Sequence, residues 1–179
     1  PKPQTPNPKP QTPCRCCEII MNVMISKVSC QYKVQSVCVD PSESVLIASG
    51  NGYISRYLIP SLKETHVNMI QGFVSSSIFS SDGSYVFIGL YHIDGSEDRI
   101  IKFFSPDLSQ MCIYSNHTKS ITCLQFHRKI GVLISGSKDC TMMLWNPKTD
   151  VMIAQLRGHK DSVQSIAISN SQLFFLSGG

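Results

Sequence analysis

Short apolar runs separated by turn-forming residues dominate the chain after its first seventeen residues. The runs are rich in Val, Ile, Phe and Tyr, and clusters of Gly, Ser, Asp, Asn and Pro lie between them. No stretch of ten or more residues shows a sustained helical period. This pattern predicts an all-β fold made of many short strands.

One strand-and-turn pattern recurs along the chain. Its clearest copy contains four apolar runs, at 120–126, 132–137, 141–146 and 151–156, with turn residues between them. A new copy begins at His159, which lies 42 residues after His117. A repeat of this length predicts stacked supersecondary units, each of which buries a face against the next.

A second copy lies upstream and matches less closely. Residues 74–79 and 85–88 align with the first two runs, and Asp98 precedes Phe104 by six residues. In the clearest copy Asp139 precedes Trp145 by the same interval. The second copy is longer because it carries an insertion around residues 91–96.

The earliest copy begins near residue 34 and keeps the same order of runs. Residues 34–39 and 45–49 supply its first two runs, and Asn51 and Tyr57 are again six residues apart. Asn therefore stands where the clearest copy has Asp, and Tyr stands where it has Trp. The chain thus holds about three and a half copies of the pattern.

At these residues the chain resembles the WD40-repeat family. The resemblance covers roughly residues 30–179 and implies a partial, open β-propeller of four-stranded antiparallel blades. It gives the following expected organisation: a Pro/Cys-rich disordered tail at 1–17, an extra strand at 18–29, divergent repeat 1 at 30–69, divergent repeat 2 with a loop insertion at 70–116, repeat 3 at 117–158, and truncated repeat 4 at 159–179.

The resemblance also implies a structural set of hydrogen-bonded side chains in each blade. A buried indole N–H and a buried imidazole must find partners, because an unpaired buried polar group costs about 1–3 kcal/mol. The expected members are His117, Ser135, Asp139 and Trp145 in repeat 3, with His159 and Ser177 in repeat 4. Ser137 lies two residues after Ser135 on the same strand face, so it is an alternative for the serine position.

Repeats 1 and 2 depart from this set. Cys30 and Ile70 occupy the histidine position, and Tyr57 and Phe104 replace the tryptophan. We therefore expect apolar packing to hold these two blades and expect them to be less rigid.

The first seventeen residues are of low complexity. Pro1-Lys-Pro-Gln-Thr-Pro6 recurs as residues 8–13, and proline at this density favours a polyproline-II tether. Such a segment is either a ligand for an SH3 or WW domain or a solvated tail. The cluster of Cys14, Cys16 and Cys17 is compatible with metal, redox or lipid chemistry, or has no role.

Charge and hydropathy narrow the class of partner. The net charge is +4, of which Lys2, Lys9 and Arg15 supply three, so residues 18–179 carry 13 basic and 12 acidic side chains. No basic stripe typical of a nucleic-acid binder is present, and no apolar stretch is long enough for a membrane span. No secretory signal is recognisable, so we expect an intracellular, cytoplasmic protein with mostly reduced thiols.

Catalytic and metal-binding interpretations find little support. A serine, a histidine and an aspartate suggest a catalytic triad, but no Gly-x-Ser-x-Gly motif is present and the resemblance gives these residues a structural role. The acidic cluster at 94–98 is too short for a twelve-residue calcium loop. We therefore expect no enzyme activity, no cofactor and no metal.

The remaining function is binding, since propeller loops carry partners on a rigid scaffold. The first hypothesis is a protein-interaction scaffold, with a partner-binding loop at Tyr91, His92, Asp94 and Glu97 because the insertion departs from the repeat template. The alternative is a phosphoinositide-headgroup-binding propeller, which would need more basic residues than Arg128 and Lys129.

The number of repeats predicts an incomplete ring. Seven blades of about 40–45 residues need roughly 280–315 residues, and about 150 are available here. We therefore expect a fragment of a larger propeller, or a ring that a second chain or a missing segment completes.

Overall fold

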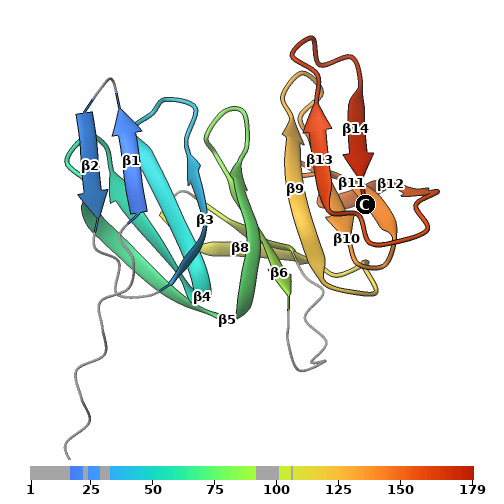
Figure 1. Ribbon diagram of the computed structural model, residues 1–179, viewed down its shortest axis with the longest axis horizontal. Helices are drawn as coiled ribbons and strands as arrows, with labels where there is room; N and C mark the ends of the chain where they lie inside the picture. The colour runs from blue at the N-terminus through green and yellow to red at the C-terminus, as the bar shows by residue number, and fades with distance from the viewer. Residues whose placement is uncertain (1–16, 22–23, 29–32, 92–100, 106) are drawn as a thin grey trace, which may run out of the picture. The chain divides into compact units, whose positions relative to one another are not determined.

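The computed structural model describes residues 17–21, 24–28, 33–91, 101–105 and 107–179 (Figure 1). These residues form strands joined by turns, which confirms the all-β prediction. No helix within these ranges is long and apolar enough to span a bilayer. The strands are β1 (Cys17–Met21), β2 (Met24–Val28), β3 (Val34–Val39), β4 (Val45–Leu58), β5 (Lys63–Phe79), β6 (Val86–Tyr91), β7 (Ile101–Phe104), β8 (Gln110–Tyr114), β9 (Ile121–His127), β10 (Val132–Ser137), β11 (Thr141–Asn146), β12 (Val151–Arg157), β13 (Ser165–Ile168) and β14 (Phe175–Gly178).

The chain divides into two compact units, residues 1–33 and 34–179. In the first unit β1 and β2 form an antiparallel hairpin in which Cys17 pairs with Val28 and Met21 with Met24. The single strand expected over 18–29 is therefore wrong, because the apolar run reverses direction between Met21 and Met24. The expected tail at 1–17 lies outside the described residues except for Cys17, which begins β1.

In the second unit, β9 to β12 form a four-stranded antiparallel sheet in chain order, the third blade. Each strand pairs only with its neighbours in sequence, as short turns require. The last two strands, β13 and β14, pair antiparallel and begin a fourth blade. This topology confirms the four-stranded antiparallel blade predicted from the repeat.

The strand β4 is a hairpin in itself. Fourteen extended residues would span about 45 Å, yet the Ile59 amide at one end donates to the Ser44 carbonyl at the other, with 2.8 Å between the atoms. The chain turns back at Gly52, whose φ of 79° is readily adopted only by glycine. The turn of the third blade has Cys140 with φ 66° at the equivalent position.

The strand β5 serves two blades. Residues 63–69 pair with the second arm of β4, and residues 74–79 pair with β6. Gly72, with φ 99°, lies between the two parts. The first blade thus contains β3, both arms of β4 and the start of β5, and the second contains the end of β5 with β6, β7 and β8.

The same turn follows the first strand of every blade. The amide four residues after the strand donates to a carbonyl at the strand end. The acceptor is either the last residue of the strand or the residue that follows it, and the pairs are Glu43 to Asp40, Gly83 to Ser80, Gly131 to His127 and Gln172 to Ser169. All four donor residues have positive φ. We call these four segments the inner turns, residues 40–44, 80–84, 127–131 and 169–172; their recurrence is independent support for four copies of one unit.

Apolar side chains fill the space between successive blades. One cluster contains Ile54 of the first blade with Ile88 and Leu90 of the second, and another contains Phe87 of the second blade and Trp145 of the third. Gly89 and Gly136 allow adjacent blades to approach closely, because a Cβ on Gly89 would lie 2.7 Å from Ile121 of the third blade and a Cβ on Gly136 would lie 2.8 Å from Val163 of the fourth. The core of each blade is therefore completed by the next blade.

Candidate functional site

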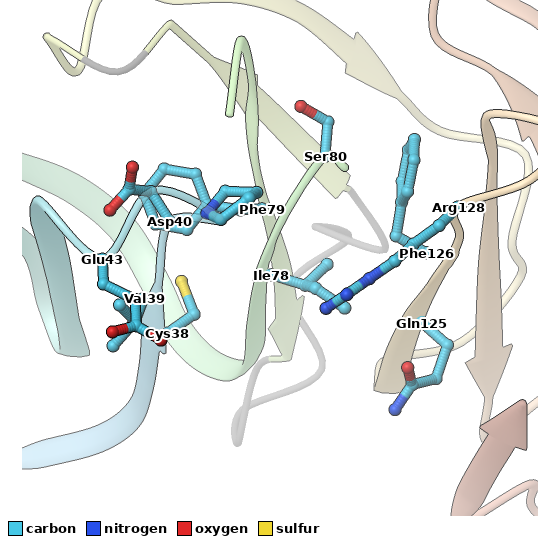
Figure 2. A pocket seen from close by; sticks show the side chains of 11 residues that line it. Cys38, Val39, Asp40, Glu43, Ile78, Phe79, Ser80, Gln125, Phe126 and Arg128 are labelled. Atoms are coloured by element: carbon cyan, nitrogen blue, oxygen red, sulfur yellow. The ribbon is translucent and has the colours of Figure 1, made fainter. Parts of the chain in front are cut away.

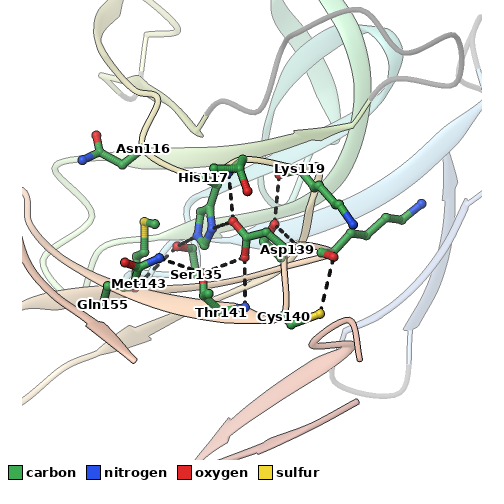
Figure 3. Close-up of polar contacts among 12 residues, drawn as sticks. Asn116, His117, Lys119, Ser135, Asp139, Cys140, Thr141, Met143 and Gln155 are labelled. Atoms are coloured by element: carbon green, nitrogen blue, oxygen red, sulfur yellow. Dashed lines mark hydrogen bonds and ion pairs between the residues drawn. The ribbon is translucent and has the colours of Figure 1, made fainter. Parts of the chain in front are cut away.

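The hydroxyl of Ser135 is the centre of a buried polar set in the third blade (Figure 3). It lies on β10, 2.8 Å from Nε2 of His117 and 2.9 Å from Nε1 of Trp145 on β11. Ser135 has no exposed surface, and His117 and Trp145 are each 2% exposed. The set joins the loop before β9 to two strands of the sheet.

Asp139, in the turn between β10 and β11, anchors the other side of the imidazole. Its Oδ2 lies 2.9 Å from Nδ1 of His117 and accepts the amide of Thr118 at 2.9 Å. Its Oδ1 accepts both the amide and the hydroxyl of Thr141. One carboxylate therefore fixes two loops at the same end of the blade.

The contacts determine where the protons lie. Burial lowers the pKa of His117, although the neighbouring Asp139 opposes this shift, so the ring is neutral. Burial alone would raise the pKa of Asp139, but hydrogen bonds from Thr141, Thr118 and His117 hold it below its ordinary value. A neutral imidazole that donates from Nδ1 to the carboxylate must accept at Nε2, so Ser135 donates to His117 and accepts from Trp145.

This arrangement is structural in its chemistry. Asp, His and Ser stand in the order of a catalytic triad, but the serine oxygen already accepts the indole N–H and is completely buried. The ring of Tyr114 stacks on Trp145 with 4.8 Å between centroids and covers it further. A substrate cannot reach this hydroxyl, so the set holds loops and strands in place.

The fourth blade contains the corresponding pair of residues. Nε2 of His159 lies 2.7 Å from the hydroxyl of Ser177 on β14. Both positions are 42 residues after their equivalents in the third blade, and both are partly exposed. The structure therefore brings these two predicted residues together as well.

The first two blades contain different side chains at these positions. Ile47 lies four residues before Asn51, as Ser135 lies before Asp139, and it is completely buried among apolar side chains. Asn51 is exposed and accepts a hydrogen bond from Gln35 at 2.9 Å. Ile70 and Phe104 are buried in the same cluster, while Cys30 lies outside the described residues.

Polar contacts also join one blade to the next. The side-chain amide of Asn68 donates to the Leu108 carbonyl, and the Tyr114 hydroxyl donates to Asp150 at 3.1 Å. Leu108 and Asp150 occupy equivalent positions in the turns after the third strands, where both have positive φ. The outer strands of the first and second blades are thus each tied to a turn of the next blade.

The predicted partner-binding loop lies mostly outside the described residues. Tyr91 ends β6, and its ring packs against Phe73 with 5.5 Å between centroids. His92, Asp94 and Glu97 lie outside the described part. Cys14 and Cys16 do too, and the described residues contain no group of His, Cys, Asp or Glu arranged to hold a metal ion.

Two adjoining hollows at the inner turns were not anticipated from the sequence. One has a volume of about 390 Å³ and lies between the inner turns of the first three blades, and Figure 2 shows its lining side chains. The other, of about 320 Å³, lies between the second and third blades. Ser80, Phe126 and Arg128 line both hollows. The recurring turn after each first strand was the signal that could have located them.

Comparison with known families identifies the repeat. The family described as WD domain, G-beta repeat, matches residues 108–146 and 151–179. The match covers the third blade, the start of the fourth blade and the end of the second. It therefore includes all six residues of the predicted polar set.

Curated relatives match over shorter segments. Human Striatin-3 is 31% identical over 93 residues, which are 49% of this chain and 12% of that protein. Polycomb protein esc of Drosophila virilis is 46% identical over 57 residues, which are 30% of this chain and 13% of that protein. Nuclear distribution protein nudF 2 of Aspergillus clavatus is 31% identical over 70 residues, 39% of this chain and 16% of that protein. The chain thus spans a small part of these relatives.

Solved structures agree on the fold. The structure titled "Crystal structure of RRP9 WD40 repeats" superimposes with a TM-score of 0.67 at 21% identity, over 74% of this chain and 41% of that chain. "Structure of U3-55K" gives a TM-score of 0.66 at 22% identity, over 74% and 42% of the two chains. Residues 108–146 and 151–179 thus match the WD repeat, and the solved structures together with the blade topology show that the chain has the blade fold of a β-propeller.

Proposed function

We propose that this chain is a non-catalytic protein-interaction scaffold and a segment of a larger propeller. The observation that carries the proposal is the contrast between buried and exposed polar side chains in the third blade. Ser135, His117 and Trp145 of its polar set are buried and bond to one another, while Lys119, Lys138 and Lys148 in its loops are exposed. Rigid strands that display exposed loops are suited to binding.

The exposed apolar side chains of the outermost blades support the segment proposal. Val37 and Val39 on β3 are 43% and 42% exposed. In the fourth blade Leu173, Phe174 and Leu176 are 58–74% exposed. Equivalent faces of the inner blades are buried against a neighbour, so we infer that further blades, from the same polypeptide or another chain, cover these side chains.

The insertion at 91–97 remains our proposed partner-binding loop, because it is the main departure from the repeat template. The alternative of a phosphoinositide-binding propeller has no observation in its favour at this loop. The intracellular, cytoplasmic location likewise stays a prediction from the sequence.

Partner capture tests the proposal. The native polypeptide that carries this sequence would be cross-linked in cells and its partners identified by mass spectrometry. A variant with residues 91–97 replaced by Gly-Ser of equal length should lose partners that the native protein captures. A matched variant with the proline repeats at 1–13 replaced should keep them. Loss only in the second variant would transfer binding to the tail, and capture of no protein by the native polypeptide would refute the scaffold.

A further inference from the structure

The two hollows at the inner turns adjoin, since Ser80, Phe126 and Arg128 line both of them. Arg128 and Phe126 line both of them, and Figure 2 shows the Arg128 side chain reaching across toward Ile78, with Asp40 and Glu43 on the opposite side. We call this surface the turn groove and define it by Asp40, Glu43, Ser80, Phe126, Arg128 and Lys148. It runs from the first blade to the third.

The floor of the turn groove is apolar. Phe79 and Phe126 are 6% and 8% exposed, and both also belong to the cores between blades. Ile130, which lines the second hollow, is 61% exposed at the tip of its inner turn. A rigid aromatic floor with an exposed aliphatic rim is the kind of surface that holds a side chain of a peptide or protein.

Three cations surround the end of the groove at the third blade. Arg128 and Lys129 come from the inner turn, and Lys148 comes from the turn between β11 and β12. All three are exposed, and within the described part of the chain their side chains form no ion pair or hydrogen bond. Their charges are therefore available to a ligand.

Unlike the three cations, two of the carboxylates that line the groove form hydrogen bonds within their own turns. Asp82 faces the second hollow, but its Oδ1 accepts the Ser80 hydroxyl at 2.6 Å and the Ser84 amide at 3.1 Å. Asp40 is likewise engaged by the amides of its own turn. Glu43, at the first blade, is exposed. Exposed Glu43 thus lies at the first blade, while at the third blade three exposed cations outnumber Asp82.

We propose that the turn groove binds an acidic peptide segment of a partner protein. An apolar side chain of the segment fills the hollow above Phe126, and its carboxylates lie against Arg128, Lys129 and Lys148. Repulsion by Glu43 directs the acidic residues toward the third blade, which fixes the direction of the segment. This inference rests on the proposed scaffold function and names the chemistry of one partner.

A peptide agrees with the observations better than a membrane surface does. The groove is concave and each hollow has the volume of a binding pocket, whereas a lipid surface needs a convex, uniformly basic contact. A uniformly anionic lipid surface would also lie against Glu43, which a peptide with its acidic residues only at the third blade avoids. The apolar floor favours a ligand that carries side chains over a free anion.

The experiment measures fluorescence anisotropy of a labelled peptide of alternating glutamate and leucine, titrated with the native polypeptide. A peptide of alternating glutamine and leucine is the matched probe. The test variant combines Arg128→Gln, Lys129→Gln and Lys148→Gln. The control variant combines Lys119→Gln, Lys138→Gln and Lys160→Gln, which removes the same charge from exposed side chains at the opposite end of the blades.

The native protein should bind the glutamate peptide more tightly than the glutamine peptide. An exposed ion pair contributes a factor of roughly 1.4 to 5, so the test variant should bind about 3- to 125-fold more weakly and the control should bind as the native protein does. Equal binding by both variants, or no preference for glutamate, would overturn the proposal.

Two further outcomes separate this inference from the scaffold function. Failure to bind the peptide while partners are still captured in cells would refute the groove alone. Vesicles of phosphatidylcholine and phosphatidylserine are titrated in parallel. Binding to vesicles that the test variant loses, without binding to the peptide, would assign the groove to a membrane surface and overturn the proposal.

Discussion

Replacement of Ser135 by alanine is the sharpest perturbation of the third blade. The hydroxyl accepts the Trp145 N–H and donates to Nε2 of His117, and no solvent can replace it because Ser135 is completely buried. Each buried polar group left unpaired costs about 1–3 kcal/mol. Ser135→Ala leaves two such groups, so the free energy of unfolding of the third blade should fall by roughly 2–6 kcal/mol.

Native-state hydrogen exchange of β10 and β11 measures this change locally in the native polypeptide. The control is Ser115→Ala, since Ser115 is an exposed serine two residues before His117 and a change there should stay within about 0.5 kcal/mol. The double variant with His117→Leu tests the coupling. Because the leucine removes one of the two unpaired groups, Ser135→Ala should cost less in that background than alone.

A small effect would refute the argument. A loss below about 0.5 kcal/mol for Ser135→Ala, or the same loss with and without His117, would mean that the hydrogen bonds do not stabilise the blade. The polar set would then be a consequence of the fold and not a cause of its rigidity.

Three further predictions concern close approach, turn conformation and pH. Gly136→Ala and Gly89→Ala should each lower the free energy of unfolding, measured by thermal melting, by about 1–3 kcal/mol, because the new Cβ overlaps the next blade. Gly178→Ala should lower it less in the same assay, because the atom nearest to its new Cβ would be 3.3 Å away. Gly83→Ala should lower the free energy of unfolding by about 1–2 kcal/mol, because an alanine is strained at φ 72°. An unchanged free energy of unfolding in urea would contradict this. As the pH falls below about 6.5, the free energy of unfolding should decline, because burial lowers the pKa of His117 and the unfolded chain therefore takes up this proton before the folded chain does. The decline due to His117 is at most about 1.4 kcal/mol per pH unit. His117→Leu should abolish this decline in urea unfolding measured across that pH range.

The third repeat could be predicted from the sequence because its polar residues supply one another's hydrogen-bond partners within one blade. A buried Trp145 needs an acceptor and a buried His117 needs partners on both nitrogens, and the spacing of Ser135 and Asp139 supplies them on adjacent strands. The period of the apolar runs then gives the four-stranded blade. The spacing of the polar residues and the four-stranded blade are thus both consequences of burying these side chains with their hydrogen-bond partners.

The features that could not be predicted depend on reversal of the chain and on contacts between blades. Residues 18–29 contain no glycine or proline, and Asn22 alone was too weak a signal to predict the reversal between β1 and β2. In the first blade Ile47 replaces a polar partner, and the turn at Gly52 became evident only from the hydrogen bond that closes β4. The turn groove arises from three inner turns about 40 residues apart, which a scan for local motifs does not bring together.

The central claim is that the blades are a rigid support and that their loops bind a protein partner. Hydrogen exchange of the native polypeptide, alone and with its captured partner, tests this claim most directly. The account predicts new protection in loops at the blade ends, such as the inner turn 127–131, with unchanged exchange in β10 and β11. Protection that appears in the strands of the blade core, or no partner-dependent protection anywhere in residues 34–179, would contradict it.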